Sequence, residues 1–197
     1  MAVATAERRA AILAAALVEF NAHGVAGASI EEIRRRSGAS VGSIYHHFGG
    51  KDGIAGALYL EGLRDYQVGF VAALEGAAST KDGIERGVRF HLEWIDSHRD
   101  LARFLLLGRD ASVMVKTARP LRELNRRFLA AVSRWMAPAV ARGELRAVGP
   151  QLLTALWIGP SQELARHRLA DHRSQASLTD AAEVLAQAAW RSLSLEG

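Results

Sequence analysis

The sequence predicts an all-α protein of about nine helices. Apolar residues in the first segment recur every three or four positions, which is the period of an amphipathic helix. They are Ile12, Leu13, Ala16, Leu17 and Phe20. No segment shows the sustained alternation of apolar and polar residues that indicates a half-buried strand. With 197 residues, of which 49% are hydrophobic, the chain is long and apolar enough to bury a core.

The composition also excludes several classes of protein. The chain has no cysteine, which rules out a disulfide scaffold and a thiolate metal site and fits a reducing, cytoplasmic compartment. The net charge of +4 permits attraction to phosphate without requiring it. An apolar run at 10–18 follows two arginines as in a signal peptide, but Glu19 interrupts it, so we interpret it as a domain helix. No other stretch approaches the roughly 18 apolar residues of a membrane span, so we expect no membrane partner.

Glycine and capping residues delimit the first two helices. We expect the first from about Thr5 to Gly24, because glycine can adopt the left-handed conformation that ends a helix. The second begins at Ser29, which forms a capping box with Glu32. It is short, since Gly38 ends it.

The third helix, at 41–48, spans only about two turns, with Ser40 as its natural N-cap. A long fourth helix follows Gly49 and Gly50 and carries an apolar stripe. After a loop at 76–81 we expect helices at about 84–97, 101–107 and 121–139, the second of them short. A glycine-containing turn at 142–149 precedes a helix at about 150–164. Ser177 or Thr179 caps the last helix, which ends near 193.

The second and third helices have the arrangement of a helix-turn-helix, in which the second helix of the pair enters a major groove. That arrangement alone is not specific, but the amino-acid sequence of the segment is. Residues 29–54, SIEEIRRRSGASVGSIYHHFGGKDGI, resemble the signature of the TetR/AcrR family of transcriptional regulators. The shared features are an SGAS turn, a recognition helix ending in Tyr-X-His-Phe and a Lys that opens the next helix. Beyond the first 50 or so residues the resemblance rests on helix count and order.

The resemblance implies a helix-turn-helix DNA-binding domain at 1–50 and a helical ligand-binding and dimerisation domain at 51–197. It also implies a homodimeric repressor that binds a palindromic operator and is released by a small molecule, apolar or anionic. We expect no cofactor.

The N-terminal end of the third helix suits DNA, because its free amides and positive dipole end favour phosphate or base edges. Gly42 is costly inside a helix unless close approach is needed. The resemblance implies phosphate contacts from Tyr45, His47 and Lys51, with Val41, Ser43 and His46 facing bases. The expected DNA-binding set is Ser29, Ser40, Val41, Gly42, Ser43, Tyr45, His46, His47 and Lys51.

Some of these residues have plainer interpretations. Phe48 is better explained as core than as a contact, and the arginines at 34–36 as a solvated face, with one of them near DNA. The sequence also departs from the family pattern at Gly50, where Ser is common. Because glycine caps less well, we expect a looser phosphate contact by Lys51.

The resemblance places the ligand among the apolar and aromatic faces of the fourth to eighth helices, although any amphipathic helix buries such a stripe as core. The expected ligand-binding residues are Tyr66, Phe70, Phe90, His91, Trp94, Arg103, Phe104, Arg109, Met114, Phe128, Trp135 and Trp157. The arginine-rich stretch 99–142 favours an anionic ligand or is a solvated face. The last two helices would pair across a twofold axis through Leu153, Leu156, Leu164, Val184, Leu185, Ala188 and Leu193.

Two other functions compete with this one. An enzyme would need a metal or a catalytic group, and His91 with His98 on one helix is the only suggestion of one. Their spacing is not that of an HExxH site and no nucleophile, base and orienting residue group together, so we expect neither metal nor catalysis. A DNA-binding protein without ligand control stays open.

Overall fold

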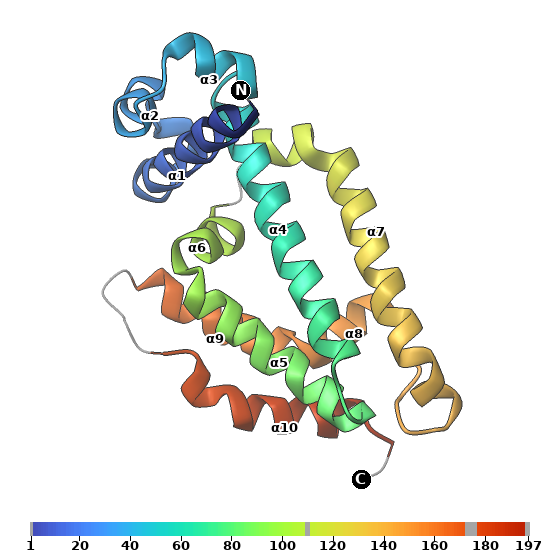
Figure 1. Cartoon of the computed structure of the whole chain (residues 1–197). Coiled ribbons are helices and arrows are strands. Elements are labelled where there is room, and N and C mark those ends of the chain that lie inside the picture. The colour runs from blue at the N-terminus through green and yellow to red at the C-terminus, as the bar shows by residue number, and fades with distance from the viewer. Residues whose placement is uncertain (1, 109–110, 172–176, 196–197) are drawn as a thin grey trace. The chain divides into compact units, whose positions relative to one another are not determined.

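The computed structural model describes residues 2–108, 111–171 and 177–195, and they form no strand (Figure 1). The all-α fold class is therefore confirmed. The helices are α1 (Ala2–Gly27), α2 (Ile30–Ser37), α3 (Val41–Phe48), α4 (Lys51–Glu75), α5 (Thr80–Ser97), α6 (Arg99–Leu107), α7 (Ala111–Ala141), α8 (Pro150–Trp157), α9 (Gly159–Ala170) and α10 (Ala182–Leu193), with a 3-10 turn η1 (Thr179–Ala181).

The boundaries of α2 and α3 lie where the capping residues predicted them. The hydroxyls of Ser29 and Ser40 each accept a hydrogen bond from a backbone amide three residues on, at 3.4 and 3.1 Å. Gly38 and Gly49 follow the two helices with φ of 65° and 69°, in the left-handed region that glycine favours. These caps satisfy amides and carbonyls that a helix end leaves unpaired.

Four expected boundaries were wrong. Gly24 is non-helical as predicted (φ 68°, ψ 168°), but helix resumes and α1 ends at Gly27. The expected helix at 150–164 is two helices: α8 ends at Trp157, and Pro160 lacks the amide hydrogen that would continue the helical bonding pattern. The turn η1 stands before α10, whose N-cap Ala181 has no side-chain bond. Helix α7 also begins at its residue 111, well before the expected start.

The described chain forms two compact units. Unit 1 comprises 1–63 and 100–122, and unit 2 comprises 64–99 and 123–197. The boundaries between the units fall inside α4 and α7, so they do not follow the expected functional boundary at residue 50. That boundary concerns which residues bind DNA and which bind a ligand, and it stays a prediction.

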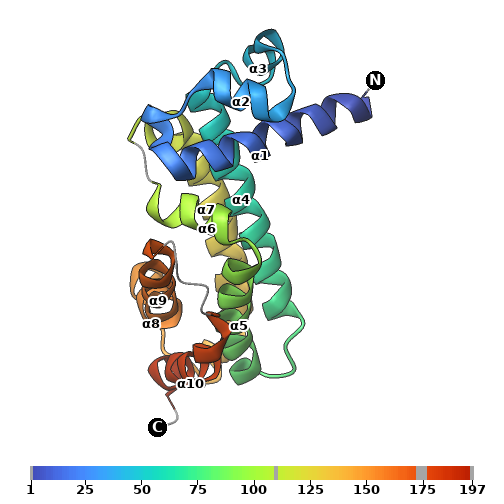
Figure 2. The same cartoon turned by 90° about the vertical axis from the view of Figure 1, so that its left-hand side faces the viewer.

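In unit 1, α1 lies alongside the helix-turn-helix (Figure 2). Side chains from α1, α2, α3 and α4 are fully buried there: Ile12, Ala16, Ile33, Ile44, Ile54 and Ala55. The Phe20 ring stacks on Phe104 of α6 with a centroid distance of 5.8 Å. The segment Thr5–Gly27 is long and apolar enough to cross a membrane. Its buried face belongs to this core, and core helices meet the same criterion.

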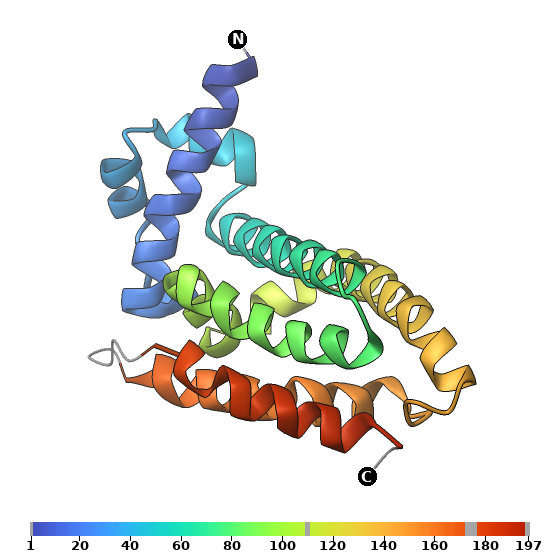
Figure 3. The same ribbon diagram turned by 60° about the horizontal axis from the view of Figure 1, so that its bottom comes forward.

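In unit 2, α5 is the central helix and packs against α9 and α10 (Figure 3). Its buried face carries Ile84, Val88, His91, Leu92 and Ile95, with the apolar residues at the three- and four-residue spacing that predicted the helix. Phe70 and Leu74 of α4, Leu169 of α9 and Ala186 of α10 complete this core.

Candidate functional site

Helix α3 is anchored on one side and exposed on the other. Ile44 has no exposed surface, whereas Val41 is 43% exposed and Tyr45 53%. Gly42 and His46 are exposed as well, and Ser43 and His47 are half-buried. The structure therefore brings together, on one short helix, the residues expected to face bases and phosphates, and it leaves their outer side open. Such a helix can enter a groove without unfolding its own core.

The junction between α3 and α4 is built from glycine. Gly50 has φ of 130°, a conformation that L side chains rarely adopt, so serine would be strained there. At Gly53 an added Cβ would lie 1.7 Å from the Phe48 carbonyl oxygen. The first turn of α4 thus packs directly on the backbone that ends α3. Gly53 was missed by the sequence interpretation, although three glycines in five positions were a visible signal.

Lys51 does not point away from the protein. Its Nζ donates hydrogen bonds to the carbonyl oxygens of Ala26 at 2.6 Å and Ala28 at 3.0 Å. Both carbonyls stand at the C-terminal end of α1, where a positive charge is favoured. A lysine ammonium has three donors, so one remains for another acceptor.

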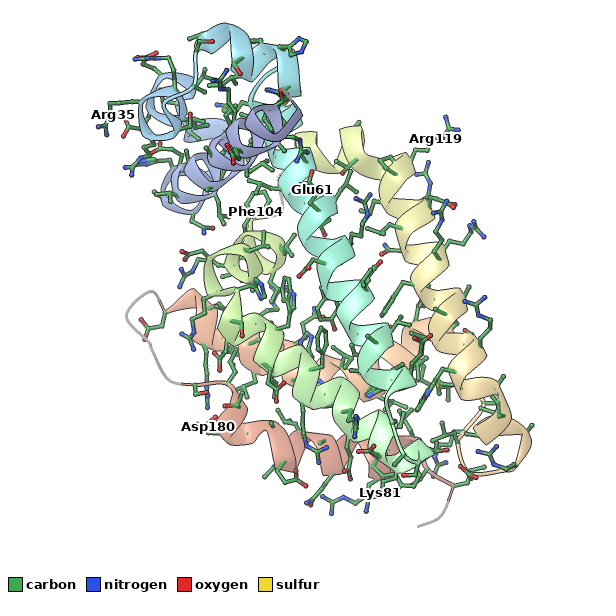
Figure 4. The ribbon with its side chains drawn as sticks, viewed as in Figure 1. Arg35, Glu61, Lys81, Phe104, Arg119 and Asp180 are labelled. Atoms are coloured by element: carbon green, nitrogen blue, oxygen red, sulfur yellow. The ribbon has the colours of Figure 1, made fainter. Side chains whose placement is uncertain are left out.

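The three arginines of α2 all have carboxylate partners within unit 1. Arg34 pairs with Glu31, Arg35 (Figure 4) with Glu32 and Arg36 with Glu19. Hydrogen bonds from Arg34 and Arg35 hold the pKa of Glu31 and of Glu32 below its ordinary value. Glu19 is only 3% exposed, and its bond of 3.0 Å to Arg36 ties α2 to α1. The run is therefore a charge-compensated face, and a DNA contact by one of the three stays a prediction.

Arg9 joins three elements of unit 1, and the sequence interpretation missed it. Its guanidinium donates two hydrogen bonds to the carboxylate of Glu61 on α4, one of them at 2.9 Å (Figure 4). The same group lies 5.3 Å from the ring centroid of Phe48, the last residue of α3. Arg9 and Glu61 are 52 positions apart, so no local pattern could have paired them.

Most of the expected ligand-binding residues come together in unit 2. The aromatic cluster, defined as Tyr66, Phe70, Phe90, His91, Trp94, Phe128, Trp135 and Trp157, is linked by ring contacts of 5.3–6.2 Å. Phe104 and Arg103 lie in unit 1 instead, where Arg103 pairs with Asp100. Arg109 and the side chain of Met114 lie outside the described residues.

His91 is a buried polar member of this cluster, in ring contact with Tyr66. It is 4% exposed, and its Nδ1 is 2.9 Å from the Tyr66 hydroxyl. Its Nε2 is buried with no hydrogen-bond partner among the described residues. Burial lowers the pKa of His91 to about 4 and raises the pKa of Tyr66 above its usual range, so both groups are neutral near pH 7. A buried unpaired nitrogen is a place where a polar ligand atom would be stabilised.

The rest of the cluster is closely packed, and glycines make the room. An added Cβ at Gly83 would lie 2.1 Å from Trp135 Cζ2, and one at Gly69 would lie 2.4 Å from Phe90 Cζ. The indole N–H of Trp94 donates to Asp65 and that of Trp157 to the Ile84 carbonyl, each at 2.8 Å. The sequence shows glycines inside the helices, but only the contacts show that aromatic rings pack against them.

A groove of about 450 Å³ lies between the parts of α4 and α7 in unit 2. Its lining is largely apolar and includes Val68, Val71, Leu124 and Phe128. The charged side chains in it are Arg64, Arg127 and Glu75, and Arg127 is paired with Glu123 at 2.6 Å. Phe128 is the single member of the expected ligand-binding set in this lining. A groove of this composition suits a ligand with an apolar body.

The expected dimer residues divide into two groups. Leu153 is 8% exposed and Leu193 has no exposed surface, so both serve the core of the protomer. Val184 is 69% exposed, and Leu156, Leu164, Leu185 and Ala188 are half-buried. The second group retains apolar surface that a partner would cover.

The histidines considered for a metal site have other contacts. His91 faces Tyr66, and His98 Nδ1 lies 2.9 Å from the Trp94 carbonyl oxygen. Asp96 of the same helix accepts from the Leu178 amide at 2.7 Å. Among the described residues, no three His, Cys, Asp or Glu side chains gather as metal ligands would.

Comparison with known proteins agrees with this architecture. The family model described as bacterial regulatory proteins, tetR family, matches residues 12–58. No curated protein matches the chain. The fold is similar to that of FadR, the fatty acid degradation regulator from Bacillus halodurans, with 17% identity, a TM-score of 0.77 and coverage of 91% of this chain and 96% of that one.

Two further solved structures have the same fold over nearly their full length. FadR from Bacillus subtilis, in complex with stearoyl-CoA, has 16% identity and a TM-score of 0.78, covering 92% of this chain and 97% of that one. A TetR family transcription regulator from Marinobacter aquaeolei VT8 has 16% identity and a TM-score of 0.76, covering 98% and 99%.

A helix-turn-helix with an exposed second helix, followed by further helices, defines the class of helix-turn-helix transcription regulators. The match of the family model to the α1–α4 segment specifies the class further. Residues 12–58 thus match the model of the tetR family, and the described chain has the fold of solved TetR family regulators.

Proposed function

We propose that this chain is a ligand-controlled repressor, which binds a palindromic operator as a homodimer in the cytoplasm and leaves it when a small molecule binds. The observation that carries the proposal is the open side of α3, where Val41 and Tyr45 are exposed beside a fully buried Ile44. DNA offers thymine methyl groups to an apolar side chain and phosphates to a phenol. Repression is favoured over activation because blocking a polymerase needs no further contact surface.

The expected DNA-binding residues keep their proposed roles on this surface, apart from Lys51, which is treated below. Tyr45 and His47 would bind phosphates, and Val41, Ser43 and His46 would face bases. Gly42 allows close approach, since an added Cβ would meet nothing closer than Ser40 Oγ at 4.0 Å within the protein. The packing of the protein therefore does not require glycine at position 42. Close approach of the nucleic acid would require it.

The proposed dimer would bury the exposed and half-buried apolar residues of α8, α9 and α10 across a twofold axis. Two copies of α3 would then contact successive major grooves about 34–36 Å apart. Helix α4 begins directly behind α3 and contributes Tyr66 and Phe70 to the aromatic cluster. A ligand that shifts α4 would change the spacing of the two recognition helices.

The proposed ligand has an apolar body and an anionic group. The apolar lining of the groove and the unpaired His91 Nε2 in the aromatic cluster support an apolar body with a polar group, and Arg64 in the groove is the cation that favours an anionic one. The stearoyl-CoA bound to the FadR structure from Bacillus subtilis has both an acyl chain and phosphates. Long-chain acyl-CoA is therefore the first compound to test.

The DNA part is tested by selection from random duplexes at about 50 and 200 mM salt. We expect a palindromic consensus and affinity that falls steeply as salt rises, with loss of selection in Tyr45→Ala. Val18→Ala is the matched control, because it removes a 48% exposed side chain from α1. No enriched sequence with the wild-type protein would refute the proposal.

The ligand part is tested by reciprocity. If acyl-CoA weakens operator binding by a given factor, it must bind the free protein more tightly than the operator-bound protein by that same factor. Titration calorimetry with and without the selected duplex measures both affinities. Failure of acyl-CoA and of other apolar, cationic and anionic compounds to raise the melting temperature would favour a DNA-binding protein without ligand control.

A further inference from the structure

Lys51 occupies a position that joins both ends of the helix-turn-helix. It is the first residue of α4, directly after the glycines that follow α3. Its two acceptors, the carbonyls of Ala26 and Ala28, stand directly before Ser29, the N-cap of α2. One ammonium group therefore connects the chain entering the motif with the chain leaving it.

The carbonyls at the end of α1 need such a partner. The last carbonyls of a helix have no intrahelical donor and carry the negative end of the helix dipole. The α1 end is also irregular, because Gly24 has non-helical backbone angles, although the Ala28 amide still bonds to the Gly24 carbonyl at 3.1 Å. A charged donor at 2.6 and 3.0 Å stabilises this end at one place relative to α4.

We infer that Lys51 is a positioning residue for DNA binding, which holds the start of α2 against the start of α4 and so sets the orientation of α3. This inference rests on the proposed operator binding. It differs from the phosphate contact that the family resemblance implies. The close packing of Gly53 on the Phe48 carbonyl fixes the α3 end of the same junction, so loss of the lysine would free only the α2 end.

The test compares Lys51→Met and Lys51→Gln with Lys81→Met in operator binding over a range of salt. Both Lys51 variants lose the charge, but the glutamine amide can still donate. Lys81→Met removes the same charge from an exposed position at the start of α5 (Figure 4). Binding is measured on the selected operator and on a scrambled duplex, well below each melting temperature.

A positioning role predicts weaker operator binding for Lys51→Met by roughly tenfold to a hundredfold, as for lost charge-assisted hydrogen bonds. It predicts a smaller loss for Lys51→Gln, unchanged binding to the scrambled duplex and an unchanged salt slope. Hydrogen exchange of the amides at 28–32 should also become faster in Lys51→Met without DNA. Lys81→Met should match the wild type in every measurement.

Two results would overturn the inference. A phosphate contact would lower the salt slope of both Lys51 variants by about 0.9 and weaken the scrambled duplex as well. A role in stability alone would lower the melting temperature and leave operator affinity intact. If the wild-type protein selects no operator, the proposed function fails instead, and the hydrogen-exchange comparison still tests the contact.

Discussion

The exposed surface of α3 and the aromatic cluster of unit 2 differ in where their side chains point. On α3 the chemically informative residues face solvent, and a single buried residue, Ile44, anchors them. In the cluster the informative residues face one another, and Phe70 is only 2% exposed. The α3 surface could bind DNA without rearrangement. A ligand could reach the aromatic cluster only by displacing packed side chains.

This difference separates affinity from stability. Changes on α3 remove contacts that only DNA would make, so they should alter binding more than folding. Changes in the cluster remove packing on which unit 2 depends, so they should alter folding first. Single substitutions on the two surfaces test that separation.

Phe70→Ala should lower the free energy of unfolding by about 3–5 kcal/mol, because it empties a site surrounded by four aromatic rings. Thermal or denaturant unfolding measures the loss. Val68→Ala on the same helix is the control, since that side chain is 65% exposed and should cost little. Equal effects from the two would mean that the cluster is not packed as described.

His91 should make stability depend on pH. Its pKa is about 4 in the folded protein and about 6.5 when unfolded, so the unfolded chain binds more protons between these values. Stability should therefore fall as pH falls from about 6.5 to 4, by about 3 kcal/mol in total. Unfolding measured across this range in the wild type and in His91→Gln isolates the effect, with His167→Gln as an exposed control. Parallel curves for the wild type and His91→Gln would contradict it.

Gly53→Ala should weaken both folding and DNA binding, because its methyl group collides with the Phe48 carbonyl oxygen. We expect a loss of about 1–3 kcal/mol in stability, the usual range for overpacking. Gly42→Ala is the matched variant: its methyl group fits the protein, so stability should rise by up to about 1 kcal/mol while operator affinity falls. Stable Gly42→Ala with full affinity would refute close approach of DNA at that position.

Ser40→Ala and Ser79→Ala each remove an N-cap hydrogen bond of 3.1 Å, from α3 and α5 respectively. Each should cost about 1 kcal/mol in unfolding. Operator affinity should fall only for Ser40→Ala, because Ser40 belongs to the proposed DNA surface. Loss of affinity in both variants would mean that stability, and not position, controls binding.

The local elements near the N-terminus were predictable because their signals are local. Ser29, Ser40, Gly38 and Gly49 cap or end helices through bonds within a few residues, and the structure confirms each. The break after Trp157 was missed although Gly159 and Pro160 were a local signal for it, because a proline inside a helix removes an amide donor and disrupts the helix.

The functional contacts were less predictable. The phosphate contact of Lys51, which the family resemblance implies, stays a prediction, whereas its acceptors within the protein lie 23 and 25 positions away and no local pattern indicates them. Leu153 and Leu193, expected at a dimer interface, are buried within the protomer. An apolar helical stripe alone does not distinguish the core of its own chain from an interface.

The sequence by itself determined the all-α class, the helix-turn-helix and the resemblance of its N-terminal segment to the TetR family, because periodicity, caps and a continuous motif are properties of neighbouring residues. The tertiary structure decided which charges are already paired, which aromatic rings meet and where Lys51 donates. Those outcomes depend on distances between segments far apart in the chain, as between Arg9 and Glu61 or Tyr66 and His91, and only the packed fold brings such groups together.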